Sequence, residues 1–299
     1  MRSPLAVFLI VAFGFSWALG LALWALGPEA HLAVRTALMI VYMFGPALGA
    51  LAAQRVAGER PLAPLAVGLR PNRWWLYAWL LPMALQPLIL GASLLLPGVQ
   101  WAPDMSGFFE RLTIALPPEQ IEDAKRQMEA IPPALYWAML LGQPLVAGLS
   151  VNALAAFGEK LGWRGWLFRR FAPLGFWRRA LVVGALWGVW HAPVILQGHN
   201  YPQHPVLGVA AMMVFCVLLA PLLDLARAQG GSVWAAALMH GTINAAGGLS
   251  ILFVRGGGDL VVGPTGAAGL LVLAAAGLTL FVVDRRRGGA LTAPPTRPS

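Results

Sequence analysis

Four polar side chains capable of acid–base and hydrogen-bonding chemistry occur in otherwise apolar stretches of the second half of the chain. They are Glu159, His191, His240 and Asn244. A carboxylate or an imidazole can activate water as a general base, and imidazole or carboxamide N–H groups can stabilise a developing oxyanion. Because ionisable groups at membrane depth are costly, each one in an apolar segment is a functional candidate. Together they form the inventory of a hydrolytic site.

His240 and Asn244 are the most closely spaced of these residues, in the segment His-Gly-Thr-Ile-Asn. Positions four apart share one face of a helix and lie about 6 Å apart along its axis. The pair can therefore direct two hydrogen-bond donors at one oxygen, as an oxyanion site requires. A polar contact between two membrane helices is the alternative explanation, because Asn and His often make such contacts.

His191 and Glu159 lie in two other regions of the chain. His191 is followed by Pro193, which is expected to interrupt the helix and free backbone groups beside the imidazole. A lone histidine there can equally be a packing residue. Glu159 can form an ordinary ion pair with Lys160 or Arg164. The simple explanations stay open for each residue alone, and the occurrence of all four together favours a site.

The composition indicates that much of the surface faces lipid. Of the 299 residues, 59% are hydrophobic and 11% are charged, and the mean hydropathy is +0.70. Soluble domains carry about 25% charged residues, so the chain lacks the charges that a water-facing surface needs. The formal charge of +9 does not indicate nucleic acid, because the basic residues occur in short groups between apolar runs. A single cysteine, Cys216, excludes an intrachain disulfide and a cysteine-based metal site.

The elements that position these residues are predicted to be membrane-spanning helices, which need about 20 apolar residues each. Candidate spans are 5–27, 33–56, 74–96, 134–157, 180–198, 205–226, 231–253 and 262–283. Proline and glycine stand at many of their ends, as expected where helices stop. The sequence therefore predicts an all-α, polytopic membrane protein with about eight transmembrane helices. Its catalytic core is expected in the helices around residues 135–250.

The distribution of Lys and Arg predicts the orientation of these spans, because cytoplasmic loops are enriched in both. With eight spans and a cytoplasmic N terminus, the cytoplasmic side holds 16 of the 21 basic residues. These are Arg2, Arg55, Arg60, Arg70, Arg73, Lys160, Arg164, Arg169, Arg170, Arg178, Arg179, Arg227, Arg285, Arg286, Arg287 and Arg297. The other side holds Arg35, Arg111, Lys125, Arg126 and Arg255. We therefore expect a multi-pass protein of the cell membrane with both termini in the cytoplasm.

Three parts of the chain are distinguished by their composition. They are N-terminal transmembrane helices (1–133) with an outer polar loop (103–133), a core (134–253), and a last transmembrane helix with a basic tail (254–299). The polar loop is predicted to form a short amphipathic helix at the outer surface. Residues 163–171 mix aromatic residues with arginines and are predicted to lie at the inner interface. The Pro- and Gly-rich tail from Gly288 onward is predicted to be disordered.

Three short motifs in the second half of the chain resemble those of a known family. They are Gly-Glu-Lys-Leu-Gly-Trp-Arg-Gly (158–165), Leu-Trp-Gly-Val-Trp-His (186–191) and His-Gly-Thr-Ile-Asn (240–244). In order and spacing they resemble the motifs of the CPBP intramembrane proteases, bacterial relatives of the type II CAAX prenyl endopeptidases that are also called the ABI family. The family pattern is Glu-Glu-x-x-x-Arg, then an aromatic residue four positions before His, then His-x-x-x-Asn or Asp.

The resemblance implies a role for each matching residue. Glu159 and His191 would activate the attacking water. His240 and Asn244 would stabilise the oxyanion, and Arg164 would be structural. The family has been described both as metal-independent glutamate-type proteases and as metalloproteases. We favour a site without a cofactor, and the alternative is Zn²⁺ held by Glu159, His191 and His240.

Two supporting positions depart from the family pattern. Lys160 replaces the second glutamate of the first motif, and Trp187 stands where phenylalanine is common. The tryptophan keeps the aromatic character. The lysine removes any role of a second carboxylate, which leaves an altered substrate or an inactive relative as alternatives.

The predicted function is that of an intramembrane endopeptidase that hydrolyses a peptide bond of a membrane-anchored protein or peptide. Its cavity is expected to open toward the cytoplasm. One alternative, motivated by Lys160, is an inactive relative that acts as a bacteriocin-immunity factor or a membrane scaffold. Another is a proton-coupled transporter in which Asp224 and the histidines form a proton relay, although the sequence lacks the internal repeat typical of such transporters. The expected partners are the substrate and the lipid bilayer, and not nucleic acid.

Overall fold

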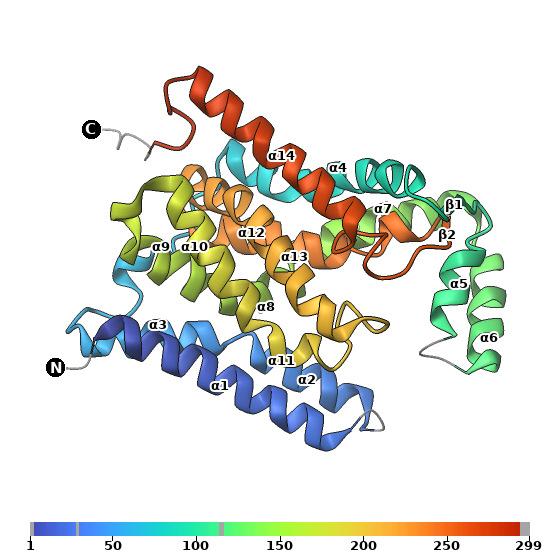
Figure 1. The fold of residues 1–299 in the computed structure, drawn as a ribbon, viewed down its shortest axis with the longest axis horizontal. Helices are drawn as coiled ribbons and strands as arrows, with labels where there is room; N and C mark the ends of the chain where they lie inside the picture. The colour runs from blue at the N-terminus through green and yellow to red at the C-terminus, as the bar shows by residue number, and fades with distance from the viewer. Residues whose placement is uncertain (1–2, 28–29, 114–116, 294–299) are drawn as a thin grey trace.

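The computed structural model describes residues 3–27, 30–113 and 117–293 and is almost entirely helical (Figure 1). The helices are α1 (Pro4–Leu26), α2 (Leu32–Tyr42), α3 (Gly45–Val56), α4 (Arg73–Leu94), α5 (Ser106–Leu112), α6 (Pro118–Glu129), α7 (Pro133–Leu149), α8 (Val151–Lys160), α9 (Leu167–Arg170), α10 (Gly175–Trp190), α11 (Ala192–Ile195), α12 (Pro205–Gly230), α13 (Val233–Ala246) and α14 (Ala267–Arg286). Short helical turns are η1 (Ala63–Leu65), η2 (Leu161–Trp166), η3 (Ala172–Leu174) and η4 (Leu249–Ile251), and two strands, β1 (Gln100–Trp101) and β2 (Val254–Arg255), form an antiparallel pair.

Among the described residues, five helical segments are long and apolar enough to cross a membrane. They are α1, α2 with α3, α4, α12 and α14, and the bent pair of α6 and α7 raises the number to six if it is one span. The prediction of an all-α polytopic membrane protein is confirmed. The remaining predicted spans, 134–157, 180–198 and 231–253, correspond to shorter or interrupted helices. These interrupted helices are the ones that carry the polar candidates.

The interruption at His191 follows from Pro193, as the sequence predicted. Helix α10 ends at Trp190, and α11 begins at Ala192 with a proline in its first turn. The freed carbonyl of Trp190 accepts hydrogen bonds from the Tyr42 hydroxyl at 2.6 Å and from the Trp17 indole at 3.1 Å. Buried backbone oxygens need hydrogen-bond partners. These two bonds supply them and attach α1 and α2 to the core beside His191.

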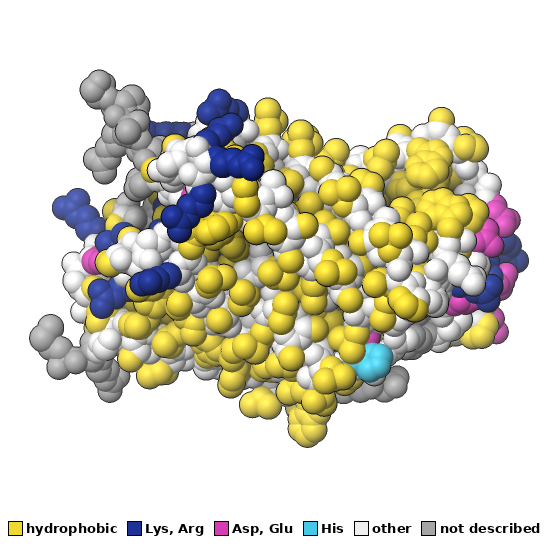
Figure 2. All heavy atoms as spheres, turned by 45° about the horizontal axis from the view of Figure 1, so that its top comes forward, with side chains coloured by type: hydrophobic (Ala, Val, Ile, Leu, Met, Phe, Trp, Pro, Cys, Tyr) yellow, Lys and Arg dark blue, Asp and Glu magenta, His cyan; other side chains and the backbone are white. Residues whose placement is uncertain are grey.

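Charged side chains gather at the two ends of the molecule, with an apolar band between them (Figure 2). The start of α1 and the end of α14 lie at the end that is on the left in Figure 1, and α5 and α6 lie at the right-hand end. The exposed arginines of the left-hand end are Arg55, Arg60, Arg70, Arg73, Arg169, Arg170, Arg178, Arg285, Arg286 and Arg287. We call this end the arginine-rich face and the end with α5 and α6 the acidic face. An apolar band between two charged ends is the surface expected of a chain that crosses a bilayer.

The described part of the polar loop 103–133 contains two helices, α5 and α6, where the sequence predicts one. Strand β1, before α5, pairs with β2 near the last span. Arg255 in β2 forms an ion pair with Glu110 at 2.6 Å, and Arg111 donates to the carbonyl of Gly256 at 2.6 Å. The loop is therefore tied to the segment that leads into α14.

The sequence predicts that residues 163–171 lie at the inner membrane interface, but most of this segment is buried inside the protein. Trp163 and Arg164 are fully buried, and only the last arginines are exposed. Arg164 Nε pairs with Asp224 Oδ1 at 2.8 Å, and Arg179 Nε pairs with Asp224 Oδ2 at 2.9 Å. This buried cluster explains the difference, since pairing lets a cation lie in the core.

The described part of the predicted disordered tail folds back on α14. Asp284 accepts hydrogen bonds from the backbone N–H groups of Leu291 and Thr292, both at 3.1 Å. Gln229 of α12 donates to the carbonyl of Leu291 at 2.7 Å. Residues 294–299, the rest of that predicted tail, lie outside the described residues.

Candidate active site

Glu159 lies in the last turn of α8, directly before the π-helical turn η2, and is only 2% exposed. Short π-helical turns within α-helices are frequent at functional sites. Two glycines let the neighbouring helices approach. A Cβ on Gly162 would be 2.5 Å from Pro46 of α3, and one on Gly241 would be 2.6 Å from the backbone of α8. Close packing at Gly241 places α13, and with it His240, against the helix that carries Glu159.

One oxygen of the Glu159 carboxylate is held by two neighbouring side chains. The indole Nε1 of Trp187 donates to Oε2 at 2.7 Å, and Lys160 Nζ donates to the same oxygen at 3.3 Å. The ammonium of Lys160 also lies 3.7 Å from the centroid of the Trp187 ring, at cation–π distance. No described residue donates a hydrogen bond to Oε1, which leaves this oxygen available to a water molecule.

The two positions that depart from the family pattern thus contact the same atom. Phenylalanine at position 187 has no N–H to donate to Oε2, and glutamate at 160 has no proton to donate when ionised. Lys160 and Trp187 therefore form one unit that holds the carboxylate in place.

His191 is oriented by the backbone of its own helix. Its Nδ1 lies 2.8 Å from the carbonyl oxygen of Trp187, and because a carbonyl only accepts, Nδ1 carries the proton in this bond. In the neutral ring the lone pair is then on Nε2. The backbone N–H of His191 bonds to Gly188 at 3.2 Å, which leaves the Trp187 carbonyl to the ring. The geometry therefore provides a proton acceptor at Nε2.

His240 and Asn244 lie one turn apart on α13, and both line the same cavity. His240 Nδ1 is buried and has no hydrogen-bond partner among the described residues, and it lies 4.0 Å from Glu159 Oε2. Asn244 is exposed to the cavity. An unpartnered buried polar atom is costly, so His240 is a group that gains from a ligand oxygen.

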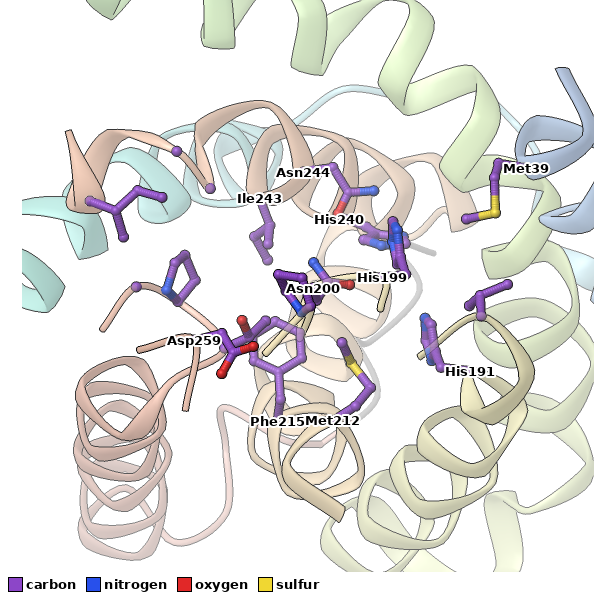
Figure 3. Close-up of a pocket in the computed structure, with 18 of the residues that line it drawn as sticks. Met39, His191, His199, Asn200, Met212, Phe215, His240, Ile243, Asn244 and Asp259 are labelled. Atoms are coloured by element: carbon purple, nitrogen blue, oxygen red, sulfur yellow. The ribbon is translucent and has the colours of Figure 1, made fainter. Parts of the chain in front are cut away.

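All four candidates, Glu159, His191, His240 and Asn244, line one cavity of about 680 Å³. Figure 3 shows His191, His240 and Asn244 around a common space, although they come from the end of α10 and from α13. Exposure rises along the cavity, from Trp187 at 1% and His240 at 5% to exposed loop residues at the other end. The spatial convergence predicted from the motifs is thus present, whereas the catalytic roles of these residues stay predictions.

Residues 141–246 match the model of the family described as type II CAAX prenyl endopeptidase Rce1-like. The match covers about a third of the chain, and we call this segment the Rce1-like domain. It contains all three motifs and all four candidates, and it agrees with the resemblance drawn from those motifs. The family is one of peptidases, so the match supports the prediction of a membrane-embedded hydrolase. None of the curated proteins matches the chain.

The cavity extends beyond the Rce1-like domain and contains groups that sequence analysis missed. His199 and Asn200, in the loop after α11, lie inside the domain, whereas Arg111 and Asp259 lie outside it (Figure 3 labels all but Arg111). His199 lies in the Gln-Gly-His-Asn turn eight residues after His191, but no motif includes it. Its proximity to the other histidines depends on how the loop folds back.

The supporting residues of the Rce1-like domain have distinct surroundings. Lys160 and Trp187 contact Glu159, as described above. Arg164 is directed instead to Asp224 on α12, with which it forms an ion pair at 2.8 Å. Asp224 thus belongs to a buried charge cluster, and the structural role of Arg164 stays a prediction.

The donors of the alternative zinc site were tested for fit. Within the described residues, no three His, Cys, Asp or Glu side chains are grouped so that they could hold a metal ion. One oxygen of Glu159 is engaged by Trp187 and Lys160, and Nδ1 of His191 by a carbonyl. The three residues do not fit a metal in this arrangement. Zinc therefore stays an untested prediction, and no step below passes through it.

Proposed function

We propose that the protein is an intramembrane endopeptidase that hydrolyses a peptide bond of a membrane-anchored protein or peptide without a cofactor. Glu159 and His191 activate water, and His240 and Asn244 stabilise the oxyanion. We further propose that both termini are cytoplasmic, because the arginine-rich face is the one that the positive-inside rule assigns to the cytoplasm.

One observation supports this proposal above the others. Among the described residues, a carboxylate with one oxygen that accepts no hydrogen bond, an imidazole with its lone pair on Nε2 and an imidazole whose Nδ1 has no partner border one partly buried cavity. A base and an oxyanion donor within reach of one point are the geometric requirements for hydrolysis of an acyl group. The largely apolar surroundings strengthen these electrostatic interactions.

The reaction proceeds in two balanced steps. A water oxygen bonds to the carbonyl carbon of the scissile peptide while Glu159 Oε1 or His191 Nε2 accepts the water proton. The carbonyl oxygen becomes an oxyanion that accepts hydrogen bonds from His240 and Asn244. The C–N bond then breaks, the proton held by the base passes to the leaving nitrogen, and the products are a carboxylic acid and an amine, which ionise to a carboxylate and an ammonium at neutral pH. No oxidant or other co-reactant is required.

The test is cleavage by the purified protein in proteoliposomes. A library of lipid-anchored peptides is incubated with the protein in heavy-oxygen water, and the products are analysed by mass spectrometry. We expect new carboxylates that contain the heavy oxygen with the wild type, and at least about a hundredfold fewer with Glu159→Gln. Equal cleavage by both proteins contradicts the site.

The second candidate function is that of an inactive relative, and Lys160 is the observation that favours it. A buried ammonium 3.3 Å from the carboxylate can be explained as a permanent ion pair that keeps Glu159 from accepting a proton. In that case the wild type releases no product, and Lys160→Glu, which restores the family residue, produces activity. The proton-coupled transporter has lost its main support, because Asp224 is paired with two buried arginines.

A further inference from the structure

The cavity is closed toward the arginine-rich face. Its inner end is formed by Glu159, Trp187 and His240, which are all buried. Lys160, also fully buried, covers the Trp187 ring, and the Arg164–Asp224 ion pair lies in the protein core nearby. Water or a peptide arriving from the arginine-rich face therefore meets packed side chains rather than an opening.

The exposed end of the cavity is formed by loops on the opposite side. The loop between α11 and α12 contributes the exposed residues His199, Asn200, Pro202 and Gln203. The loop before α14 contributes Asp259, Pro264 and Thr265, and α5 contributes Arg111. We call these eight residues the rim. Since α10 and α13 both start at the arginine-rich face, the loops that follow them lie toward the acidic face (Figure 1).

The rim is fastened by the side chain of Asp259. Its Oδ2 accepts a hydrogen bond from the backbone N–H of Gln203 at 2.7 Å, and its Oδ1 lies 2.6 Å from His204 Nδ1. Gln203 Oε1 accepts in return from the backbone N–H of Asp259 at 3.2 Å. Two loops that are far apart in the sequence are thus held together as a polar, defined opening.

We propose that the substrate segment enters the cavity from the acidic face, on the opposite side of the membrane from the arginine-rich face. With the arginine-rich face in the cytoplasm, the opening is extracytoplasmic, and the substrate class is a polypeptide segment presented at the outer surface of the membrane. This departs from the opening toward the cytoplasm that we expected from the sequence. The access route is inferred from the position of the cavity and from the charge distribution. Only the statement that the entering segment is cleaved rests on the proposed function.

Cysteine labelling in intact cells tests the access route without any need for activity. The parent chain has one cysteine, the fully buried Cys216, and serves as the blank. Single cysteines are placed at the rim (Pro202→Cys, and Thr265→Cys on the second loop), on the exposed acidic face (Gln127→Cys) and on the exposed arginine-rich face (Ala172→Cys). Each variant is treated with a membrane-impermeant, charged maleimide before and after the cells are permeabilised, and its mass gain is measured.

We expect Pro202→Cys, Thr265→Cys and Gln127→Cys to gain the mass of one reagent in intact cells. Ala172→Cys is expected to gain it only after permeabilisation. The proposal is overturned if the rim cysteines, like Ala172→Cys, react only after permeabilisation. It is also overturned if they do not react even in permeabilised cells. The same holds if Ala172→Cys reacts in intact cells while the rim is protected, because the chain is then inserted the other way round.

Failure of this proposal is distinguishable from failure of the proposed function. Labelling reports the position of the opening even if the protein cleaves nothing. Conversely, if the protein cleaves peptides but the rim cysteines do not react in intact cells, the proposed peptidase function stands and entry from the outer surface is contradicted.

Discussion

Trp187 donates its indole N–H to Glu159 Oε2 at 2.7 Å, across 28 positions in the sequence. The bond holds one oxygen of the buried carboxylate, and the other oxygen accepts no hydrogen bond from any described residue. Trp187 also provides the ring against which the ammonium of Lys160 lies. A residue that departs from the family pattern is therefore the main contact of the proposed base.

Removal of the carboxylate is expected to abolish most of the activity. Glu159→Gln keeps an oxygen for the Trp187 N–H but cannot accept the water proton, and the loss of a general base typically costs roughly a hundredfold to ten-thousandfold in rate. The measurement is kcat for a lipid-anchored peptide that the wild type cleaves. Glu59→Gln, which changes a carboxylate near the arginine-rich face, is the matched control and retains full activity. A Glu159→Gln variant with wild-type kcat contradicts the assignment.

Replacement of Trp187 by phenylalanine tests the hydrogen bond separately from the ring. Because a hydrogen bond to a charged group is worth about 1.5–3 kcal/mol, Trp187→Phe is expected to lower kcat about 10- to 100-fold and to leave KM nearly unchanged. Trp163→Phe is the control. Its indole is also fully buried, but its Nε1 has no partner among the described residues. A loss of the same size in both variants means that packing, and not the hydrogen bond, is responsible.

Substitution of Lys160 distinguishes an active enzyme from an inactive relative. Lys160→Met keeps the length of the side chain and removes its contact with Glu159 Oε2, and Lys160→Glu places a second carboxylate beside the first. We expect the wild type to be active and both variants to be slower. Lys160→Met loses the contact that holds Oε2, and in Lys160→Glu two like charges in a buried site repel each other. Initial rates of peptide cleavage decide the matter. Activity that appears only in Lys160→Glu supports the inactive relative.

The carboxamide of Asn244 is expected to act on the transition state. Asn244→Ala removes one oxyanion donor, a change that typically lowers kcat roughly a hundredfold to a thousandfold. Asn152→Ala is the control, because Asn152 donates to the carbonyl of Gly241 at 3.3 Å and lies outside the cavity lining. It is expected to lower stability slightly and leave kcat unchanged. If Asn244→Ala changes KM alone, the residue binds substrate and does not stabilise the oxyanion.

Asp224 is expected to matter for folding. Asp224→Asn leaves Arg164 and Arg179 buried without a counterion, and breaking a buried pair in this way typically costs about 3–5 kcal/mol. Thermal unfolding in detergent is the measurement. Glu59→Gln breaks a more exposed pair with Arg169 and is expected to cost less than about 1 kcal/mol. Equal melting temperatures for Asp224→Asn and the wild type contradict the structural role.

The Glu59 control has to be made at neutral pH. The hydrogen bond from the Arg169 guanidinium lowers the pKa of Glu59 below its ordinary value. The stabilisation by this pair is therefore present above the ordinary carboxyl pKa and is lost as the pH falls through the lowered pKa. At a pH where the Glu59 carboxyl is already protonated, Glu59→Gln and the wild type are expected to have the same melting temperature.

Much of the architecture could be predicted from composition and spacing. Long apolar runs predict the five long spans, because a bilayer leaves a segment of about 20 apolar residues few alternatives to a helix. Pro193 predicts the break after Trp190, because proline removes a backbone donor at a known place. The prediction was weaker where polar contacts between distant segments decide the outcome. The sequence predicts an interfacial position for residues 163–171, because the ion-pair partner of Arg164, Asp224, lies 60 positions later and local spacing does not identify it.

The sequence by itself determined which residues are chemically able to form the site, since three motifs with the right types and spacing are local properties. Tertiary structure alone decided that Lys160 and Trp187 hold the same oxygen, that His199 reaches the cavity, and that the exposed end lies away from the arginines. These facts depend on distances between side chains of different helices, and such distances are set by packing in three dimensions. A one-dimensional pattern carries no information about them.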